Sequence, residues 1–147
     1  MVRVEGFELP EELYYDRKEH LWARIEEAGV RVGLDMFGQK AAGTVVYIKI
    51  MPAGREVRKG RAFGSVEAGK YVGALKAPVN GKIAEVNEAV IADPGLVNND
   101  SYGAGWFVVI EPSSLEDDLA DLVHGREEIQ SWLETEIREY REKGWLE

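Results

Sequence analysis

The feature that most constrains the fold is a succession of short apolar runs, separated by turn residues, between positions 20 and 110. Runs that alternate in polarity or are rich in β-branched residues cover 20–25, 30–34, 44–50 and 107–110. Proline, glycine or asparagine interrupts the chain between most of these runs. This spacing predicts a small β-sandwich or barrel, and argues against a parallel sheet built from strand–helix–strand units.

Several local signals refine this prediction. Asp35 is suited to cap a short helix over 36–42, which Gly43 can end in a left-handed conformation. Asn80-Gly81 predicts a two-residue hairpin between 77–79 and 82–83, because both turn positions need a positive φ. The uninterrupted run at 107–110 predicts a strand that is buried on both faces.

The C-terminal part has a different character. Ser114 is expected to cap a helix that begins at Leu115, where acidic residues face the positive end of the helix dipole. A second helix is expected after Gly125. It carries one apolar stripe, which predicts packing on the β core, with a partner-docking helix as the alternative. We expect one domain over 1–147, with its core at about 14–115 and a helical extension at 116–147. The stripe consists of Ile129, Trp132, Leu133, Ile137 and Tyr140.

Composition excludes several function classes. The 147 residues include no cysteine, so protein-borne thiol chemistry and disulfides are absent. The net charge of −9 disfavours nucleic-acid binding, which needs cationic side chains. It suits a monomer that meets partners through basic docking faces. No secretory signal and no run of about 18 apolar residues is visible, so we expect a cytoplasmic protein without a membrane segment.

Motifs for enzyme chemistry are missing. Neither His20 nor His124 is one turn from another ligand-type side chain in a metal-binding pattern, and no Gly-x-Ser-x-Gly elbow or phosphate-binding glycine loop occurs. Adjacent carboxylates such as Asp117-Asp118 are expected on solvated faces. His20, which follows Glu19, is expected at the surface or at a strand edge with a local hydrogen bond.

Lys70 is the remaining candidate. Two β-type runs flank it, and Gly69 and Gly73 are expected to supply the backbone freedom for a tight reversal. This places Lys70 at or near a hairpin tip with its amine directed away from the core. A lysine on a flexible stem is a good target for acylation, although an ordinary solvated turn lysine has the same pattern.

Four stretches of the sequence favour an acylated Lys70 over an ordinary solvated turn lysine. Glu67 lies three residues before Lys70, and an Ala-Pro-Val-Asn-Gly string follows at 77–81. These two features form one of four stretches that together resemble the H protein of the glycine cleavage system. The resemblance covers most of residues 14–115. The other three stretches are Lys-Glu-His-Leu-Trp at 18–22, Val-Gly-Leu-Asp through Val-Tyr-Ile at 32–48, and Val-Asn-Glu-Ala followed by Asn-Asn-Asp-Ser-Tyr-Gly-Ala-Gly-Trp at 86–106.

The resemblance implies a mainly β, lipoyl-domain-like barrel-sandwich hybrid with a short N-terminal helix and C-terminal helices. It implies a non-catalytic carrier in which lipoate, joined as an amide to Lys70, is a swinging arm. The arm would move an aminomethyl group between glycine decarboxylase and aminomethyltransferase, and dihydrolipoyl dehydrogenase would reoxidise it. A lipoate ligase, or a lipoyl synthase and transferase, would install the group.

The sequence departs from the family around the attachment site. Where the family has Glu-Ser-Val-Lys-Ala-Ala-Ser-Asp, residues 67–74 read Glu-Ala-Gly-Lys-Tyr-Val-Gly-Ala. This hairpin is similar to that of lipoate-binding proteins that carry sulfur intermediates for a heterodisulfide-reductase-like complex, so that function is the alternative. A biotinyl carrier is disfavoured because no methionine flanks Lys70. An unmodified structural or regulatory module is a further alternative.

Overall fold

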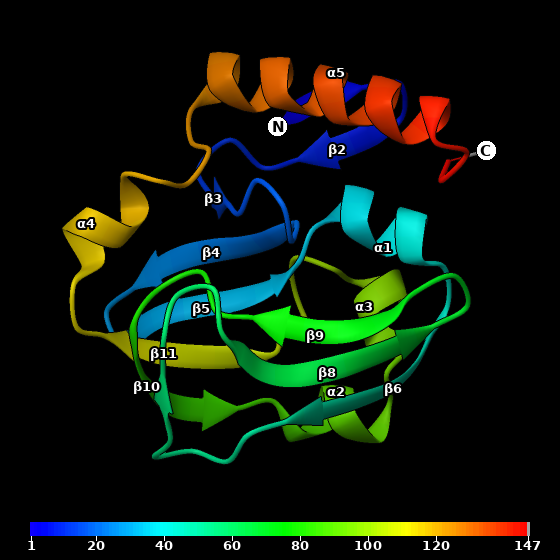
Figure 1. Ribbon diagram of the computed structural model, residues 1–147. Coiled ribbons are helices and arrows are strands. Elements are labelled where there is room, and N and C mark those ends of the chain that lie inside the picture. The colour runs from blue at the N-terminus through cyan, green and yellow to red at the C-terminus, as the bar shows by residue number, and fades with distance from the viewer. Residues whose placement is uncertain (147) are drawn as a thin grey trace.

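Antiparallel strands dominate the fold, as the short runs predict. The computed structural model describes residues 1–146. One sheet has six strands in the order β3-β4-β5-β11-β10-β7, and a three-stranded sheet in the order β6-β8-β9 lies against it (Figure 1). The strands of the large sheet are β3 Tyr14–Tyr15, β4 Leu21–Glu26, β5 Gly29–Leu34, β11 Val108–Pro112, β10 Gly81–Val86 and β7 Glu56–Val57; those of the small sheet are β6 Val45–Ile50, β8 Ala62–Ala68 and β9 Val72–Lys76.

The main hydrophobic core lies between these two sheets. Val32 of β5 and Ile48 of β6 are examples of the inward-facing residues that the two sheets contribute. Strand β11 lies inside the large sheet between β5 and β10, and residues 107–110 are almost completely inaccessible to solvent. The prediction of a strand buried on both faces is therefore confirmed, and the mainly β barrel-sandwich hybrid agrees with this arrangement.

The predicted hairpin and short helix at 20–43 are also confirmed. Strands β4 and β5 pair in register from Leu21 opposite Leu34 to Glu26 opposite Gly29. Helix α1, Met36–Ala42, follows directly, and the Asp35 carboxylate accepts a hydrogen bond from the Gly38 N–H at 2.7 Å. Gly43 ends the helix with a φ of 85°, a conformation that glycine adopts without a steric cost.

The predicted hairpin at Asn80-Gly81 is wrong. Strand β9 ends at Lys76, and β10 pairs with β11 and β7 in the other sheet, so this segment crosses between sheets. Asn80 lacks the positive φ that the turn requires. Its side chain instead donates to Asp118 at 2.9 Å and accepts from the Lys59 N–H at 2.9 Å. Tertiary hydrogen bonds thus replace the local turn that this dipeptide usually forms.

These contacts also correct two expectations for α4, Leu115–Leu119. The Ser114 side chain does not cap this helix; its hydroxyl lies 3.3 Å from the Asp118 carboxylate and can donate to it. Asp117 is exposed as expected, but Asp118 is buried and accepts from both the backbone and side-chain N–H groups of Asn80. A buried carboxylate is tolerated here because it is fully hydrogen-bonded.

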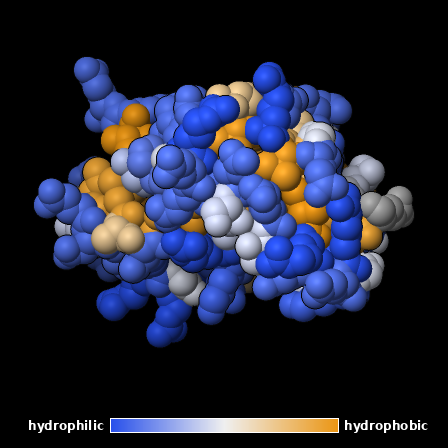
Figure 2. All heavy atoms as spheres, turned by 90° about the horizontal axis from the view of Figure 1, so that it is seen from above, coloured by the Kyte–Doolittle hydropathy of each residue, from blue (hydrophilic) through white to orange (hydrophobic). Residues whose placement is uncertain are grey.

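Helix α5, Arg126–Glu142, lies across the N-terminal end of the chain (Figure 1). Its apolar stripe is buried as predicted, although much of the surface it covers is a hairpin of β1, Val2–Val4, and β2, Phe7–Leu9, that the sequence analysis did not identify. The stripe also meets Tyr15 of β3, so it packs partly on the large sheet. The outer face of this end of the molecule is mainly hydrophilic, with smaller areas of hydrophobic atoms between the charged side chains (Figure 2).

Two short helices complete the structure. Helix α2, Glu88–Ala92, is capped by Asn87, and α3, Leu96–Asn99, follows after one turn. Asn98 of α3 donates to the Gly43 carbonyl at 3.0 Å and accepts from the Val45 N–H at 2.9 Å, which holds the connection between α1 and β6. Within residues 1–146, no helix combines the length and the apolar character that a membrane crossing needs.

Candidate functional site

Lys70 lies at the tip of the β8–β9 hairpin, as predicted, and is exposed. Antiparallel pairing runs to Glu67 opposite Val72, and the Ala68 N–H donates to the Tyr71 carbonyl at 2.7 Å to close the turn. The structure therefore presents the lysine on a defined turn at the end of a regular hairpin.

The hairpin tip is joined to the end of α1 by two backbone hydrogen bonds. The Lys70 N–H donates to the Ala42 carbonyl at 2.8 Å, and the Gly69 N–H donates to the Thr44 carbonyl at 3.0 Å. Because Asn98 also holds this α1–β6 connection, the backbone of Lys70 has a supported position. A chemical group attached to its side chain would start from a constant place on the surface.

The two glycines beside Lys70 do not act as expected. Neither Gly69 nor Gly73 has a positive φ, so the reversal does not need their backbone freedom. A Cβ at Gly73 would overlap the Tyr71 phenol, so this glycine makes room for the aromatic ring. A Cβ at Gly69 would meet only the Thr44 nitrogen at 3.9 Å, which is ordinary contact. A side chain at position 69 would therefore begin without a steric clash.

We expect Gly69→Val to impair attachment of a group to Lys70 more than it impairs folding. A Cβ at this position makes no clash, and valine adds branched bulk next to the lysine that a modifying enzyme must approach. The loss of stability should stay below about 1 kcal/mol, as for most substitutions that create no clash. Urea denaturation and the extent of modification by intact mass, measured on the same sample, test this. A variant that unfolds yet is modified normally in its folded fraction would contradict it.

A cleft opens next to Lys70, between the β8–β9 hairpin, α1 and the end of α5. Its deeper part has a volume of about 150 Å³, and a wider part of about 360 Å³ reaches Lys70 itself. Ala41, Ala42, Tyr71 and Tyr140 line both parts, so the two form a continuous depression. Leu21, Leu34, Ala74 and Leu75 make the deeper part largely apolar.

Charged groups lie at one side of this cleft. Lys76 is 3.8 Å from Glu19 across its rim, and Lys18 also lines it. Burial, and to a smaller extent the Glu19 carboxylate, raise the pKa of Tyr71. The cleft therefore combines an apolar interior with a polar mouth, which is the usual composition of a site for a small organic group.

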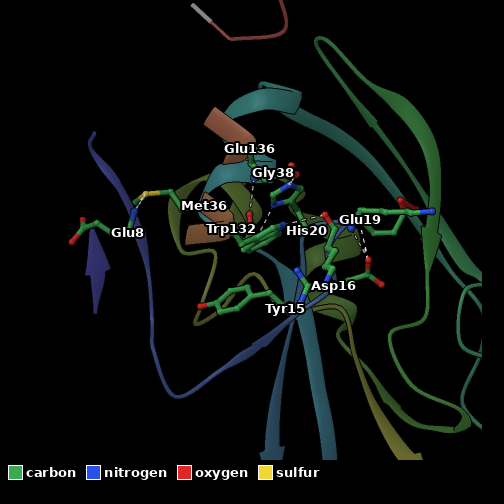
Figure 3. A network of polar contacts seen from close by, with 12 residues as sticks. Glu8, Tyr15, Asp16, Glu19, His20, Met36, Gly38, Trp132 and Glu136 are labelled. Atoms are coloured by element: carbon green, nitrogen blue, oxygen red, sulfur yellow. Dashed lines mark hydrogen bonds and ion pairs between the residues drawn. The ribbon is translucent and has the colours of Figure 1, made fainter. Parts of the chain in front are cut away.

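His20 is not at the surface, which corrects the sequence-based expectation. It is 2% exposed and has a φ of 59°. Its Nδ1 lies 3.0 Å from the Asp35 carboxylate. Its Nε2 lies 2.6 Å from Glu136 of α5, and Figure 3 shows Glu136 beside the His20 ring. The ring also stacks on Trp132, with centroids 4.7 Å apart. Glu136 lies 116 residues away in the sequence, so local sequence patterns could not reveal this arrangement.

The two carboxylates set the protonation state of His20. Burial alone would lower the pKa, but the charge and hydrogen bond of Asp35, together with those of Glu136, outweigh it and raise the pKa to about 9. The imidazole is therefore a cation at neutral pH, buried between two anions. We call these three residues the His20–Asp35–Glu136 cluster; its His20 ring lines the deeper part of the cleft.

We expect the protein to lose stability as pH rises from about 6.5 to about 9. An unfolded histidine has a pKa near 6.5, so across this window the folded state binds the extra proton, and its contribution is complete only below the window. The free energy of unfolding should fall by about 3 kcal/mol across this window. Urea denaturation at several pH values measures it. His20→Gln is the control, because it should flatten the slope; an equal slope in the variant would assign the effect to other groups.

No cluster of histidine, cysteine or acidic side chains suited to a metal ion occurs in the part of the chain that the structure describes. His124 lies away from His20, with its Nδ1 3.0 Å from the Leu13 carbonyl and its ring stacked on Tyr14. The sequence pattern thus indicates Lys70, but it does not reveal the cleft residues that the fold assembles beside it. Of these, Tyr140 was recognised only as part of the helix stripe.

Together, the hybrid of two facing sheets and the lysine at an exposed hairpin tip define the class of carrier domains with a lipoyl-domain-like fold. The family model described as glycine cleavage H-protein matches residues 13–136. The chain therefore belongs to the glycine cleavage H-protein family.

Individual relatives agree with this assignment. Glycine cleavage system H protein 2 of Aquifex aeolicus is 40% identical over 139 residues, covering 94% of this chain and 83% of the relative. A probable glycine cleavage system H protein of Pyrococcus abyssi is 40% identical over 124 residues, covering 84% and 91%. The crystal structure of a glycine cleavage system H protein from Mycobacterium marinum superposes with a TM-score of 0.67 at 33% identity, covering 71% of this chain and 87% of that one.

Proposed function

We propose that this chain is a lipoyl carrier of glycine cleavage and that lipoate is attached to Lys70. Proteins of this family carry lipoate as components of a multienzyme system. The observation that supports the assignment to Lys70 is its exposed position at the tip of a regular hairpin, next to a largely apolar cleft. An exposed amine can enter the active site of a modifying enzyme while the rest of the domain stays folded.

Attachment requires the neutral amine as nucleophile. Lys70 Nζ gives up a proton to the modifying enzyme and attacks an activated lipoyl carboxyl group, so that an amide forms and the activating group leaves. The lysine loses its positive charge in this step. The two backbone hydrogen bonds from Gly69 and Lys70 to the end of α1 keep the attachment point in place.

The residues around Lys70 fit an attached lipoyl group. The acyl chain and ring of lipoate are mostly apolar, and the cleft offers Leu21, Leu34, Ala41 and Ala74 as lining residues. When bound, lipoate supplies the disulfide and dithiol chemistry that a chain without cysteine lacks. The protein holds the group at a constant position and offers it to partner enzymes.

In this proposal the arm swings from Lys70 between partners. The lipoyl group on Lys70 would carry the aminomethyl group from glycine decarboxylase to aminomethyltransferase, and dihydrolipoyl dehydrogenase would reoxidise it. The protein acts as a cytoplasmic monomer. The family match and the names of the relatives favour this cargo over sulfur intermediates.

A decarboxylase exchange assay distinguishes the two cargoes. Lipoylated protein should support glycine-dependent exchange of labelled bicarbonate by glycine decarboxylase, because the reverse reaction needs the aminomethylated arm. Unlipoylated protein should support only the background rate. Exchange that stays at background with fully lipoylated protein, while a known H protein is active in the same assay, would contradict the glycine cleavage role and favour the sulfur carrier.

A further inference from the structure

The end of α5 forms the outer wall of the cleft beside Lys70. The helix ends at Glu142, and Gly144, with a φ of 76°, reverses the chain. The Trp145 N–H then donates to the Tyr140 carbonyl at 2.8 Å. This reversal brings the Trp145 ring onto Tyr140, with centroids 5.1 Å apart and planes at 87°. Tyr140, Trp145 and Leu146 face the cleft that Lys70 and Tyr71 line from the other side.

This wall lies beyond the part of the chain that the family model matches, which ends at residue 136. Its two aromatic rings are packed differently. Tyr140 is held by an edge contact with Phe37 of α1, with centroids 4.8 Å apart. Trp145 remains 53% exposed, with the Lys143 ammonium 4.7 Å from its ring centroid. The wall therefore presents an aromatic surface that is supported from behind and open toward the cleft.

The His20–Asp35–Glu136 cluster holds this end of the helix. Glu136 precedes Tyr140 by one helical turn, so both side chains lie on the same face of α5. The 2.6 Å contact between Glu136 and His20 connects that face to the beginning of α1, because His20 also contacts Asp35. Trp132, one turn earlier, stacks on the same imidazole (Figure 3). His20 thus links the chain segment before β4, helix α1 and helix α5.

We propose that His20 is a positioning residue that holds the end of α5 against the cleft, so that the lipoyl arm on Lys70 lies against Tyr140 and Trp145. This rests on the proposed lipoylation of Lys70. The arm is the occupant because Lys70 itself lines the wider part of the cleft, and its tether keeps the local concentration of the arm high. Aromatic rings on an apolar lining suit its acyl chain and disulfide ring.

The occupant must also leave the cleft when a partner enzyme engages it. Tyr71 and Trp145, on opposite sides of the cleft, are each about half exposed. Contact with such an open wall shields the dithiolane ring only partly from solvent. The wall thus supports a resting position of the arm from which a partner can withdraw it.

Contact between a disulfide and an indole quenches tryptophan fluorescence, which provides a direct test. Protein lipoylated on Lys70 should emit less than protein octanoylated on Lys70, which has the same amide and chain but no disulfide. Most of this difference should disappear in Trp145→Phe. The other three tryptophans remain as an internal reference.

The His20 contact is tested by Glu136→Gln, which removes the carboxylate but leaves the buried imidazole in place. The lipoyl-dependent quenching should fall by at least half, measured well below the melting temperature. Glu134→Gln, at an exposed position on the same helix, is the matched control and should quench normally. His20→Gln should reproduce the loss if it folds.

Two results would overturn the proposal. One is quenching that survives in Trp145→Phe, which places the arm elsewhere. The other is full quenching in Glu136→Gln despite a lower melting temperature, which reduces His20 to a structural role. A missing lipoyl mass would be seen before any fluorescence is recorded; it would refute the proposed function and this contact together, whereas lipoylated protein without quenching refutes the contact alone.

Discussion

Lys70→Arg should abolish lipoylation and, with it, all carrier activity. Arginine keeps the positive charge and a long stem, but its guanidinium remains protonated and cannot act as the acyl acceptor. The position is exposed, so the fold should change in stability by no more than about 0.5 kcal/mol. After co-expression with a lipoate ligase and added lipoate, intact mass should show one added lipoyl group in the natural chain and none in the variant.

Lys82→Arg is the matched control for this experiment. Lys82 is also exposed and lies on β10, outside the attachment hairpin. It should be lipoylated like the natural chain and should support bicarbonate exchange equally well. Activity of Lys70→Arg without a lipoyl group would refute the carrier function. A natural chain that folds but gains no mass with a competent ligase would favour an unmodified structural or regulatory module.

Asp35→Ala should destabilise the fold by about 3–5 kcal/mol near neutral pH, because it breaks a buried ion pair and leaves the His20 cation with Glu136 as its remaining partner. Asp35 is completely buried and has two roles: it contacts the His20 ring at 3.0 Å and caps α1 through the Gly38 N–H at 2.7 Å. Alanine removes both. The cap alone contributes about 1 kcal/mol, so most of the loss of stability should come from the broken ion pair with His20.

Urea denaturation near pH 7 measures this effect, and Asp117→Ala is the control. Asp117 is an exposed acidic residue in a helix, and its removal should change stability by no more than about 0.5 kcal/mol. The deficit of Asp35→Ala should shrink above pH 9, where the natural chain also loses the imidazole proton. A loss below about 1 kcal/mol near neutral pH would show that His20 does not depend on Asp35.

The expected effects on stability in both predictions follow from the contacts that hold each position. In Lys70→Arg, the fold is expected to persist because the hairpin is held by its backbone, through β8–β9 pairing and the bonds to the end of α1. In Asp35→Ala, the effect is large because three elements meet at one imidazole. We therefore expect the stability of the fold to tolerate substitution at Lys70 but not within the His20–Asp35–Glu136 cluster.

The amino-acid sequence by itself determined the mainly β class, the β4–β5 hairpin with helix α1, the buried strand β11 and the position of Lys70 at a hairpin tip. Each depends on local information: alternation of apolar residues, a capping aspartate followed by a C-terminal glycine, and turn residues between two strands. Motif resemblance added the family, which the comparisons confirm.

Only the tertiary structure decided how Asn80, Asp118, Gly69, His20 and the two ends of the chain are used. Asn80-Gly81 has a strong local preference for a hairpin turn, but the crossover to the other sheet and the hydrogen bonds with Asp118 override it. From the sequence, His20 is expected at the surface, but it is a buried cation because Asp35 and Glu136 both contact its ring. The cleft beside Lys70 likewise forms only where α1, β9 and the end of α5 come together. Burial and charge pairing between distant segments decide such features, and no local pattern encodes them.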